Sequence, residues 1–187
     1  MKVKPSLERE IKLRFASVEQ ARAAVELTGA TPLRGRRLQE DCLLDNPAED
    51  LRVRRCVLRV RSECGKSRLT FKGPVQAAAM KLREEHETLV GDGDVLLRIL
   101  AELGFTPWFR YQKYREEFAL EDVVIAVDET PVGTFVELEG SEEGIMKVAA
   151  SLGRGASDFV VDSYRTLFVA WEQAQGKSGG NMVFEDA

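Results

Sequence analysis

Short runs of alternating polar and apolar residues dominate this sequence. In the first clear run, residues 8–13, Glu8, Glu10 and Lys12 fall on one face of a strand, and the residues between them fall on the other. Two carboxylates and an ammonium on one face make a poor hydrophobic core. They could instead hold a metal ion and a phosphate, provided that other strands supply partners for that face.

The same period of two predicts seven further strands. They cover residues 38–45, 57–61, 68–74, 81–89, 108–120, 123–130 and 134–139. Asn46-Pro47 closes the second strand, and a short loop with Gly65 joins the third and fourth strands in a hairpin. The chain is therefore predicted to consist mostly of antiparallel strands.

Helical spacing appears in four segments. Ser17 is a good N-cap for a helix that runs to residue 28, and Asp92 or Asp94 can cap a second helix that ends before Gly104. Two more helices are predicted over residues 143–152 and 163–173. Without a tandem repeat or an interior linker, residues 1–173 are predicted to form one domain. Residues 174–187, rich in Gly, Ser and polar residues, are predicted to be a disordered tail.

The phase of the charges along the strands leaves two architectures open. Arg59 and Arg61 share a face opposite apolar residues, and the same holds for Lys113 with Arg115. One reading is an open sheet whose charged face lies in water. The other is a closed barrel with helices on its apolar outside and a charge-balanced interior, because unpaired buried charge is costly.

Composition narrows the function classes. A chain of 187 residues with 44% hydrophobic and 31% charged residues is typical of a globular domain. Its net charge of −4 argues against binding nucleic acid by electrostatics alone. No apolar run approaches a membrane span, and no signal peptide is evident, so we expect a cytoplasmic protein with no membrane partner. Three cysteines without a C-x-x-C pair indicate reduced thiols.

The charged motifs, taken together and in order, resemble a known family. Its pattern is found in Glu8-x-Glu10-x-Lys12, residues 58–61, 69–74 and 83–85, Lys113-x-Arg115, Asp128-Glu129, residues 133–139 and Ser163-Tyr164. Over residues 6–173 the chain resembles the CYTH superfamily, also called triphosphate tunnel metalloenzymes. One departure is that Leu43 and Leu44 stand where the family commonly has two aromatic residues.

This resemblance implies an α+β fold, an eight-stranded antiparallel barrel that forms a tunnel, and chemistry on triphosphates with Mg²⁺ or Mn²⁺. The implied metal ligands are Glu8, Glu10, Asp128, Glu137 and Glu139. The implied phosphate-binding residues are Lys12, Arg59, Arg61, Lys72, Arg83, Lys113 and Arg115. Glu137, Glu139 and Lys12 are the implied catalytic residues. Carboxylate oxygens suit hard divalent cations, and arginine and lysine neutralise phosphate.

Three other residues are interpreted as lying outside this chemistry. Arg9 and His86 are out of phase with the charged faces, so we expect both to point away from the tunnel. Trp108 could stack on an aromatic ring of a substrate, although a structural role is the more common one for an aromatic residue near a strand start.

The preferred function is a divalent-metal-dependent hydrolase in which water attacks the terminal phosphorus of a small-molecule triphosphate. The alternative is a class IV adenylyl cyclase that converts ATP into cyclic AMP and pyrophosphate. A third reading is a non-catalytic polyphosphate-binding module, which would gain nothing from carboxylates beside its ligand. The sequence leaves monomer and homodimer open.

Overall fold

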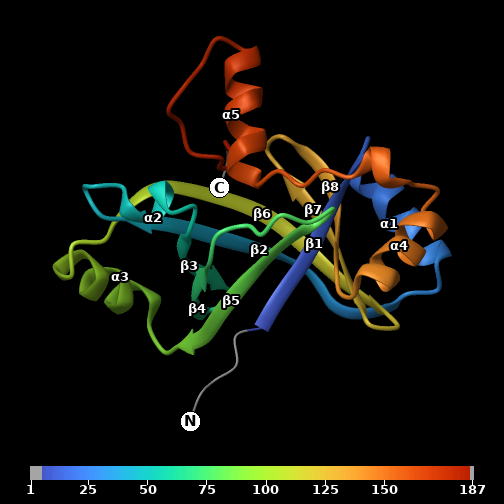
Figure 1. The fold of residues 1–187 in the computed structure, drawn as a ribbon, viewed down its shortest axis with the longest axis horizontal. Helices are drawn as coiled ribbons and strands as arrows, with labels where there is room; N and C mark the ends of the chain where they lie inside the picture. Colours follow the sequence, from blue (N-terminus) through green and yellow to red (C-terminus); the bar gives the residue numbers. More distant parts are fainter. Residues whose placement is uncertain (1–5, 186–187) are drawn as a thin grey trace.

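Eight antiparallel strands close into a barrel in the order β1-β5-β4-β3-β2-β6-β7-β8 (Figure 1). The structure is a computed structural model that describes residues 6–185. The strands are β1 (Ser6–Phe15), β2 (Thr31–Asp45), β3 (Val57–Glu63), β4 (Lys66–Lys72), β5 (Lys81–Val90), β6 (Thr106–Leu120), β7 (Val123–Thr130) and β8 (Gly133–Glu139). Of the two architectures that the periodicity left open, the closed barrel is confirmed.

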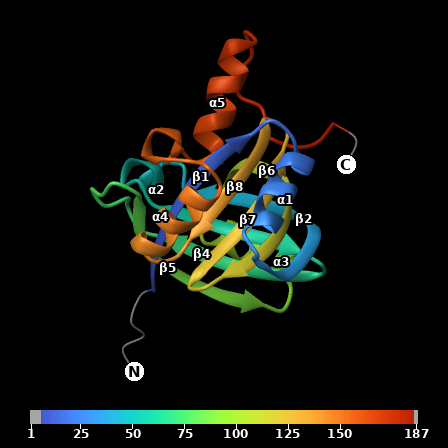
Figure 2. The same ribbon diagram turned by 90° about the vertical axis from the view of Figure 1, so that its right-hand side faces the viewer.

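Helices cover the outside of the barrel. α1 (Val18–Leu27) and α4 (Glu142–Ser151) lie against β1, β7 and β8 (Figure 2), whereas α3 (Gly93–Glu102) lies against β3, β4 and β6. Ser17, Asp92 and Ser141 cap these three helices through their side-chain oxygens. α2 (Asp50–Val53) and α5 (Tyr164–Ala174) are found on one side of the barrel, above β2 and β6 in Figure 1.

Most apolar strand residues pack outward under these helices. Ile11 of β1 and Leu138 of β8 are fully buried against Val25 of α1 and Ile145 of α4. Strand residues that alternate with these point inward, and the register pairs Lys12 with Glu137 and Glu10 with Glu139. The alternation therefore places most of the core outside the barrel and the charges inside it. Leu43, Phe109 and Phe135, which are in phase with charged residues, form a separate apolar cluster with α5.

Arg9 lies on the outer face as predicted, 3.9 Å from Glu142 of α4. His86 is exposed and does not line the interior. Both positions follow from the strand parity.

β2 begins seven residues earlier than its pattern predicted, at Thr31 rather than Leu38. Pro32 and Gly35 interrupt the alternation there, and the pairing with β6 shifts register between Pro32 and Arg34 and again between Arg34 and Arg37. The short helix α2 was also not predicted. It is held by the Asp45 carboxylate, which accepts hydrogen bonds from the backbone N–H groups of Leu51 and Arg52.

The expectation of a disordered tail after residue 173 does not describe residues 181–184, which pack along β6. The Gln112 N–H donates to the Met182 carbonyl at 2.8 Å, and the Met182 N–H donates to the Arg110 carbonyl at 3.0 Å. The Met182 side chain is fully buried beside the aromatic residues of β6 and α5. The sequence signal for this packing is the pair of apolar residues Met182 and Phe184. The polar, glycine-rich composition of the stretch around them favoured the prediction of disorder instead.

Cys42 and Cys56 are buried, Cys64 is exposed, and all three are free thiols. Within residues 6–185, no helix combines the length and the apolar character needed to cross a membrane.

Burial of Met182 gives a test of the C-terminal packing. We expect Met182→Ala to lower the free energy of unfolding by about 2–4 kcal/mol, because it removes a fully buried side chain. Urea unfolding of the full chain measures this change. Val183→Ala is the matched control, since Val183 is 42% exposed and its truncation should change the free energy by less than about 0.5 kcal/mol. Equal, small effects of both substitutions would contradict the packing.

Candidate active site

A cavity of about 1080 Å³ runs through the barrel. Thirteen basic and nine acidic side chains line it, an excess of four positive charges in a chain whose net charge is −4. Low-dielectric walls of this kind focus the field of the charges that line them. The interior therefore attracts polyanions although the whole protein is acidic.

Lys12 lies at the centre of the charges contributed by β1 and β8. It is 2% exposed, and its ammonium lies 3.2 Å from Glu10 and 3.4 Å from Glu137. Burial opposes the charged form, but the two carboxylates outweigh it and raise the pKa of Lys12. Lys12 is consequently a fixed positive charge between two of the predicted metal ligands.

Asp128 holds two of the predicted phosphate-binding residues from behind. It accepts hydrogen bonds from Arg115 Nε at 2.7 Å, from Arg115 Nη2 at 2.6 Å and from Lys113 Nζ at 2.9 Å. A fourth bond, at 2.6 Å, comes from the hydroxyl of Tyr164, the first residue of α5. Asp128 is fully buried and does not line the cavity. With four donors on its carboxylate, Asp128 is placed to position cations rather than to face a ligand.

The remaining contacts of this group involve Glu137 and the ring of Tyr164. Arg115 Nη2 also donates to Glu137 at 2.7 Å. Burial would raise the pKa of the Glu137 carboxyl, but Arg115 and Lys12 hold it well below its usual range. Lys113, buried beside Arg115, has its pKa lowered to about 8. The Tyr164 ring lies beneath both ammoniums, 4.8 Å from Lys113 and 5.2 Å from Lys12.

Asp41 organises the arginines of β3. Its carboxylate accepts from Arg61 Nε at 2.8 Å and lies 3.3 Å from Arg59 Nε. Asp41 is 2% exposed, and although burial opposes ionisation, Arg61 and Arg59 keep its pKa low. Arg59 further donates to Thr70 at 3.3 Å. The predicted phosphate-binding pair is therefore preorganised from β2.

The lysines of β4 and β5 neutralise the carboxylates of β1. Lys72 Nζ lies 2.5 Å from Glu8 and 3.1 Å from Glu85, and Lys81 contacts Glu10. Arg83 differs from the other predicted phosphate-binding residues, because its guanidinium donates to two backbone carbonyls, those of Gly73 at 2.9 Å and Arg55 at 3.1 Å.

Glu139 faces the cavity without an ammonium or guanidinium partner among the described residues. Burial raises the pKa of its carboxyl to about 7, with Glu8 and Glu137 adding to the shift. A carboxylate surrounded by carboxylates favours a bound cation. Glu139 is thus the residue at which the charge of this wall is least compensated.

The donor chemistry around Glu139 fits a hard divalent cation. Glu8, Glu10, Glu137 and Glu139 all line the cavity. In residues 6–185 no three carboxylate, imidazole or thiol groups converge into a ready-made cage. Mg²⁺ does not require one, because it usually binds one or two carboxylates together with water and substrate phosphate oxygens.

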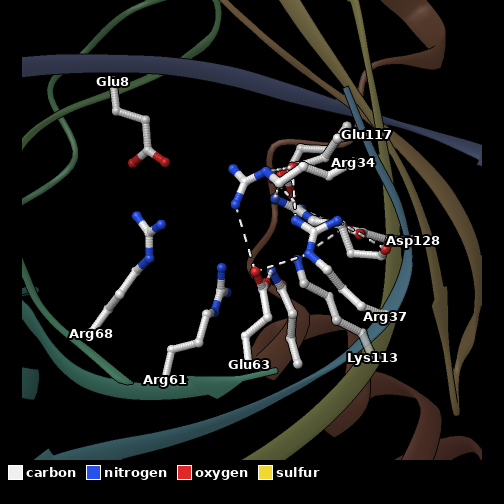
Figure 3. Close-up of polar contacts among 12 residues, drawn as sticks. Glu8, Arg34, Arg37, Arg61, Glu63, Arg68, Lys113, Glu117 and Asp128 are labelled. Atoms are coloured by element: carbon white, nitrogen blue, oxygen red, sulfur yellow. Dashed lines mark hydrogen bonds and ion pairs between the residues drawn. The ribbon is translucent and has the colours of Figure 1, made fainter. Parts of the chain in front are cut away.

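A second ion-pair network lies near the start of β2. Arg34 and Arg37 each contact both Glu63 of β3 and Glu117 of β6, with Arg37 Nη2 donating to Glu117 at 2.7 Å. Figure 3 shows this network on one side of the interior, with Glu8, Arg61 and Arg68 on the other side. Two guanidiniums and two carboxylates neutralise one another here.

The structure brings every predicted site residue except Asp128 to the lining of one cavity. Sequence reasoning missed Asp41, Lys81, Tyr164 and the network at the start of β2 as parts of the charged interior. Lys81 was detectable, because it is in phase with Arg83 on β5. Asp41 follows another acidic residue, Glu40, on a strand with little alternation, and the Arg34 network follows the irregular part of β2, so neither had a clear periodic signal.

Comparisons with known proteins agree with this geometry. The sequence profile of the CYTH domain matches residues 6–154. A protein of Methanocaldococcus jannaschii named "Putative adenylate cyclase" is 30% identical over 143 residues, which cover 71% of this chain and 82% of that protein.

Solved structures share the fold. A Pyrococcus horikoshii protein, PH1819, has a TM-score of 0.76 at 26% identity, covering 88% of this chain and 99% of that one. A protein from Hippeastrum, described as a "Putative adenylyl cyclase" with a dominant triphosphatase activity, has a TM-score of 0.66 at 18% identity and covers 92% of this chain and 96% of its own.

The Tyr164 hydroxyl gives a test of how α5 supports the site. We expect Tyr164→Phe to lower the free energy of unfolding by about 1.5–3 kcal/mol, because it removes a buried hydrogen bond to the Asp128 carboxylate. Thermal or urea unfolding measures the change. Tyr114→Phe is the matched control, because the Tyr114 ring packs against Phe184 and Arg36 and its hydroxyl makes no hydrogen bond within residues 6–185. If both variants unfold like the wild type, Tyr164 does not anchor Asp128.

Proposed function

The chain belongs to the CYTH domain family, and we propose that it is a divalent-metal-dependent hydrolase of small-molecule triphosphates. The observation that carries the proposal is the cavity itself, in which an excess of positive charge faces a wall of four carboxylates. Binding of a polyanion alone needs only the positive charge. Binding of a polyanion together with divalent cations needs the carboxylates as well.

The basic residues supply the phosphate contacts. Arg59, Arg61, Lys113 and Arg115 are buried in ion pairs with Asp41 and Asp128, which hold their charged ends in the cavity lining. Preorganised donors lose little conformational freedom when a ligand binds, and arginine forks match phosphate geometry. Lys12 and Lys72 carry further charge toward the same space.

The carboxylate wall supplies the candidate metal ligands, namely Glu8, Glu10, Glu137 and Glu139. When bound there, a divalent cation neutralises phosphate oxygens and lowers the pKa of nearby water. The family is metal-dependent in general. Asp128, which the sequence resemblance also implied as a ligand, is proposed instead to position Lys113 and Arg115, as its four hydrogen bonds support.

Binding of a phosphate chain exchanges partners within the cavity. Lys72 and Lys12 turn from carboxylates toward phosphate oxygens, and the carboxylates that they leave become available to cations. Water then attacks the terminal phosphorus, a new P–O bond forms, and the bridging P–O bond to the remaining diphosphate breaks. Lys12 and Arg115 stabilise the charge that develops on the phosphate oxygens. No side-chain nucleophile is required.

A cyclase function is the second candidate, favoured by the name of the Methanocaldococcus relative. It would use the same cations, but the ribose hydroxyl of ATP would attack the α-phosphorus. The two activities give different products. Incubation of the purified protein with Mg²⁺ or Mn²⁺ and tripolyphosphate or ATP, followed by separation of products, distinguishes them.

We expect orthophosphate release from at least one of these triphosphates. Cyclic AMP with pyrophosphate from ATP would establish the cyclase instead. Binding without turnover of any triphosphate would contradict both and support the non-catalytic module. Thiamine triphosphate extends the same assay to a second organic group.

The roles of the two walls can be separated by kinetics. We expect Glu137→Gln to lower kcat by roughly 100-fold or more with little change in KM, because it removes a candidate metal ligand. The effect of Glu137→Gln on steady-state hydrolysis decides the assignment, and unchanged turnover would show that Glu137 is not part of the reaction.

For the basic wall, we expect Arg59→Ala to raise KM roughly 10- to 100-fold, because the substitution removes charge-assisted contacts to the substrate phosphates. Arg98→Ala, on the exposed face of α3, is the matched control and should leave both constants unchanged. A fall in kcat at unchanged KM for Arg59→Ala would place this residue in the chemical step rather than in substrate binding.

A further inference from the structure

The two ends of the cavity differ in how their charges are compensated. Arg34 and Arg37, near the start of β2, are fully paired with Glu63 and Glu117 (Figure 3). β2 ends at Asp45, so the residues that follow it lie at the opposite end of the barrel. That opposite end, beside α2 and the start of α5, holds Arg165 and Arg55, which pair with no carboxylate of the described residues, together with Arg52, which pairs with Asp45 and Glu49.

Arg52 and Arg165 meet there over one aromatic ring. The guanidinium of Arg52 lies 4.5 Å from the centre of the Trp108 ring, and that of Arg165 lies 5.8 Å from it. All three residues line the cavity. Burial lowers the pKa of Arg165, and the positive charge of Arg52 adds to the shift, although Glu172 acts in the opposite direction. An anion bound beside both guanidiniums would relieve the repulsion between them.

Arg165 also lacks hydrogen-bond acceptors. Its Nε and Nη1 atoms are buried, and neither has a hydrogen-bond partner in residues 6–185. Buried donors of a charged group are costly to leave unpaired, so such a group calls for an explanation. Arg55 lines the same end of the cavity, and no carboxylate of the described residues lies within ion-pair distance of it or of Arg165.

The backbone adds to this positive end. Ser163, Tyr164 and Thr166 at the N-terminus of α5 line the cavity, where the helix dipole favours negative charge. Asp162 is the carboxylate that lines this end of the cavity, and no ion pair engages it within residues 6–185. Asp45 and Glu49, which pair with Arg52, do not line the cavity. The Arg55 carbonyl accepts a hydrogen bond from Arg83, which ties this end to the central cations.

We propose that Arg165, Arg52 and Arg55 form a distal anion subsite that takes a phosphoryl group beyond the three of a triphosphate. The inference rests on the proposed function, because it assumes that the first phosphates occupy the central cations. It narrows the substrate class to phosphate chains longer than tripolyphosphate. The size of the cavity, about 1080 Å³, is at the upper limit of ordinary ligand pockets and leaves room for the longer chain.

The test is calorimetric titration of the full-length protein in a chelating buffer, so that binding is measured without turnover. The probes are tripolyphosphate and a linear polyphosphate several units longer. We expect the wild type to bind the longer chain about tenfold or more tightly per site than it binds tripolyphosphate. One additional charge-assisted hydrogen bond contributes about this much to the affinity. Arg165→Gln should remove that advantage, and Arg165→Lys should retain part of it.

Arg98→Gln, which removes an exposed arginine on α3, is the matched control and should keep the full advantage of the longer chain. Equal affinities for the two chains in the wild type would overturn the inference. So would an advantage that Arg165→Gln and Arg98→Gln reduce equally, since that would reflect net charge alone. Neither result bears on hydrolysis, which the product assay measures with metal present.

A phosphoryl group could also reach this subsite from an organic molecule. A nucleoside triphosphate with an additional phosphate on its sugar is therefore titrated beside the unmodified nucleotide. The subsite would be supported, but its assignment to long phosphate chains overturned, by one combination of results. In it, Arg165 is needed for tighter binding of the nucleotide with the additional phosphate but not for tighter binding of the longer polyphosphate.

Discussion

The need to neutralise charge inside a closed barrel governs this structure. Most apolar side chains of the strands pack outward under the helices, so much of the interior is left to charged residues. Isolated buried charges would cost several kcal/mol each. The chain meets this constraint by placing charges of opposite sign in contact. Lys12 lies between Glu10 and Glu137, and Arg115 lies between Glu137 and Asp128.

The charges of the interior are not neutralised evenly, and the places where they are least neutralised determine what the cavity can bind. Carboxylates accumulate around Glu139, and cations accumulate around Arg165, so the interior has one place that favours metal ions and others that favour phosphate. A triphosphate with its cations satisfies both at once. The ion pairs of the free protein can therefore be regarded as internal substitutes for ligand contacts.

The C-terminal residues are part of the same arrangement. Tyr164 begins α5 and reaches Asp128 behind the central cations, while Met182 returns along β6 and lies buried near Tyr111. The packing of α5 and of residues 181–184 thereby supports Lys113 and Arg115. The interior charges and this C-terminal packing are coupled through these few side chains.

Strand parity predicted most of the strands and the faces on which most candidate site residues lie, because both depend on the period of two. Glu8, Glu10, Lys12, Glu137 and Glu139 could be placed on inner faces without coordinates. Closure of the barrel could not be derived from periodicity, since an open sheet has the same pattern, and it came from the family resemblance. Residues in irregular segments, such as Arg34 and Met182, had no periodic signal, and the positioning role of Asp128 depends on side-chain contacts that no pattern encodes.

The central claim is that the charged interior holds a phosphate chain together with divalent cations. Thermal unfolding of the full chain, alone and with Mg²⁺ plus tripolyphosphate, tests it most directly. A ligand that binds only the folded state must raise the unfolding temperature. We predict a clear rise for the wild type that is largely lost in Arg59→Gln and kept in Arg98→Gln. An unchanged unfolding temperature in the wild type at saturating ligand would contradict the account.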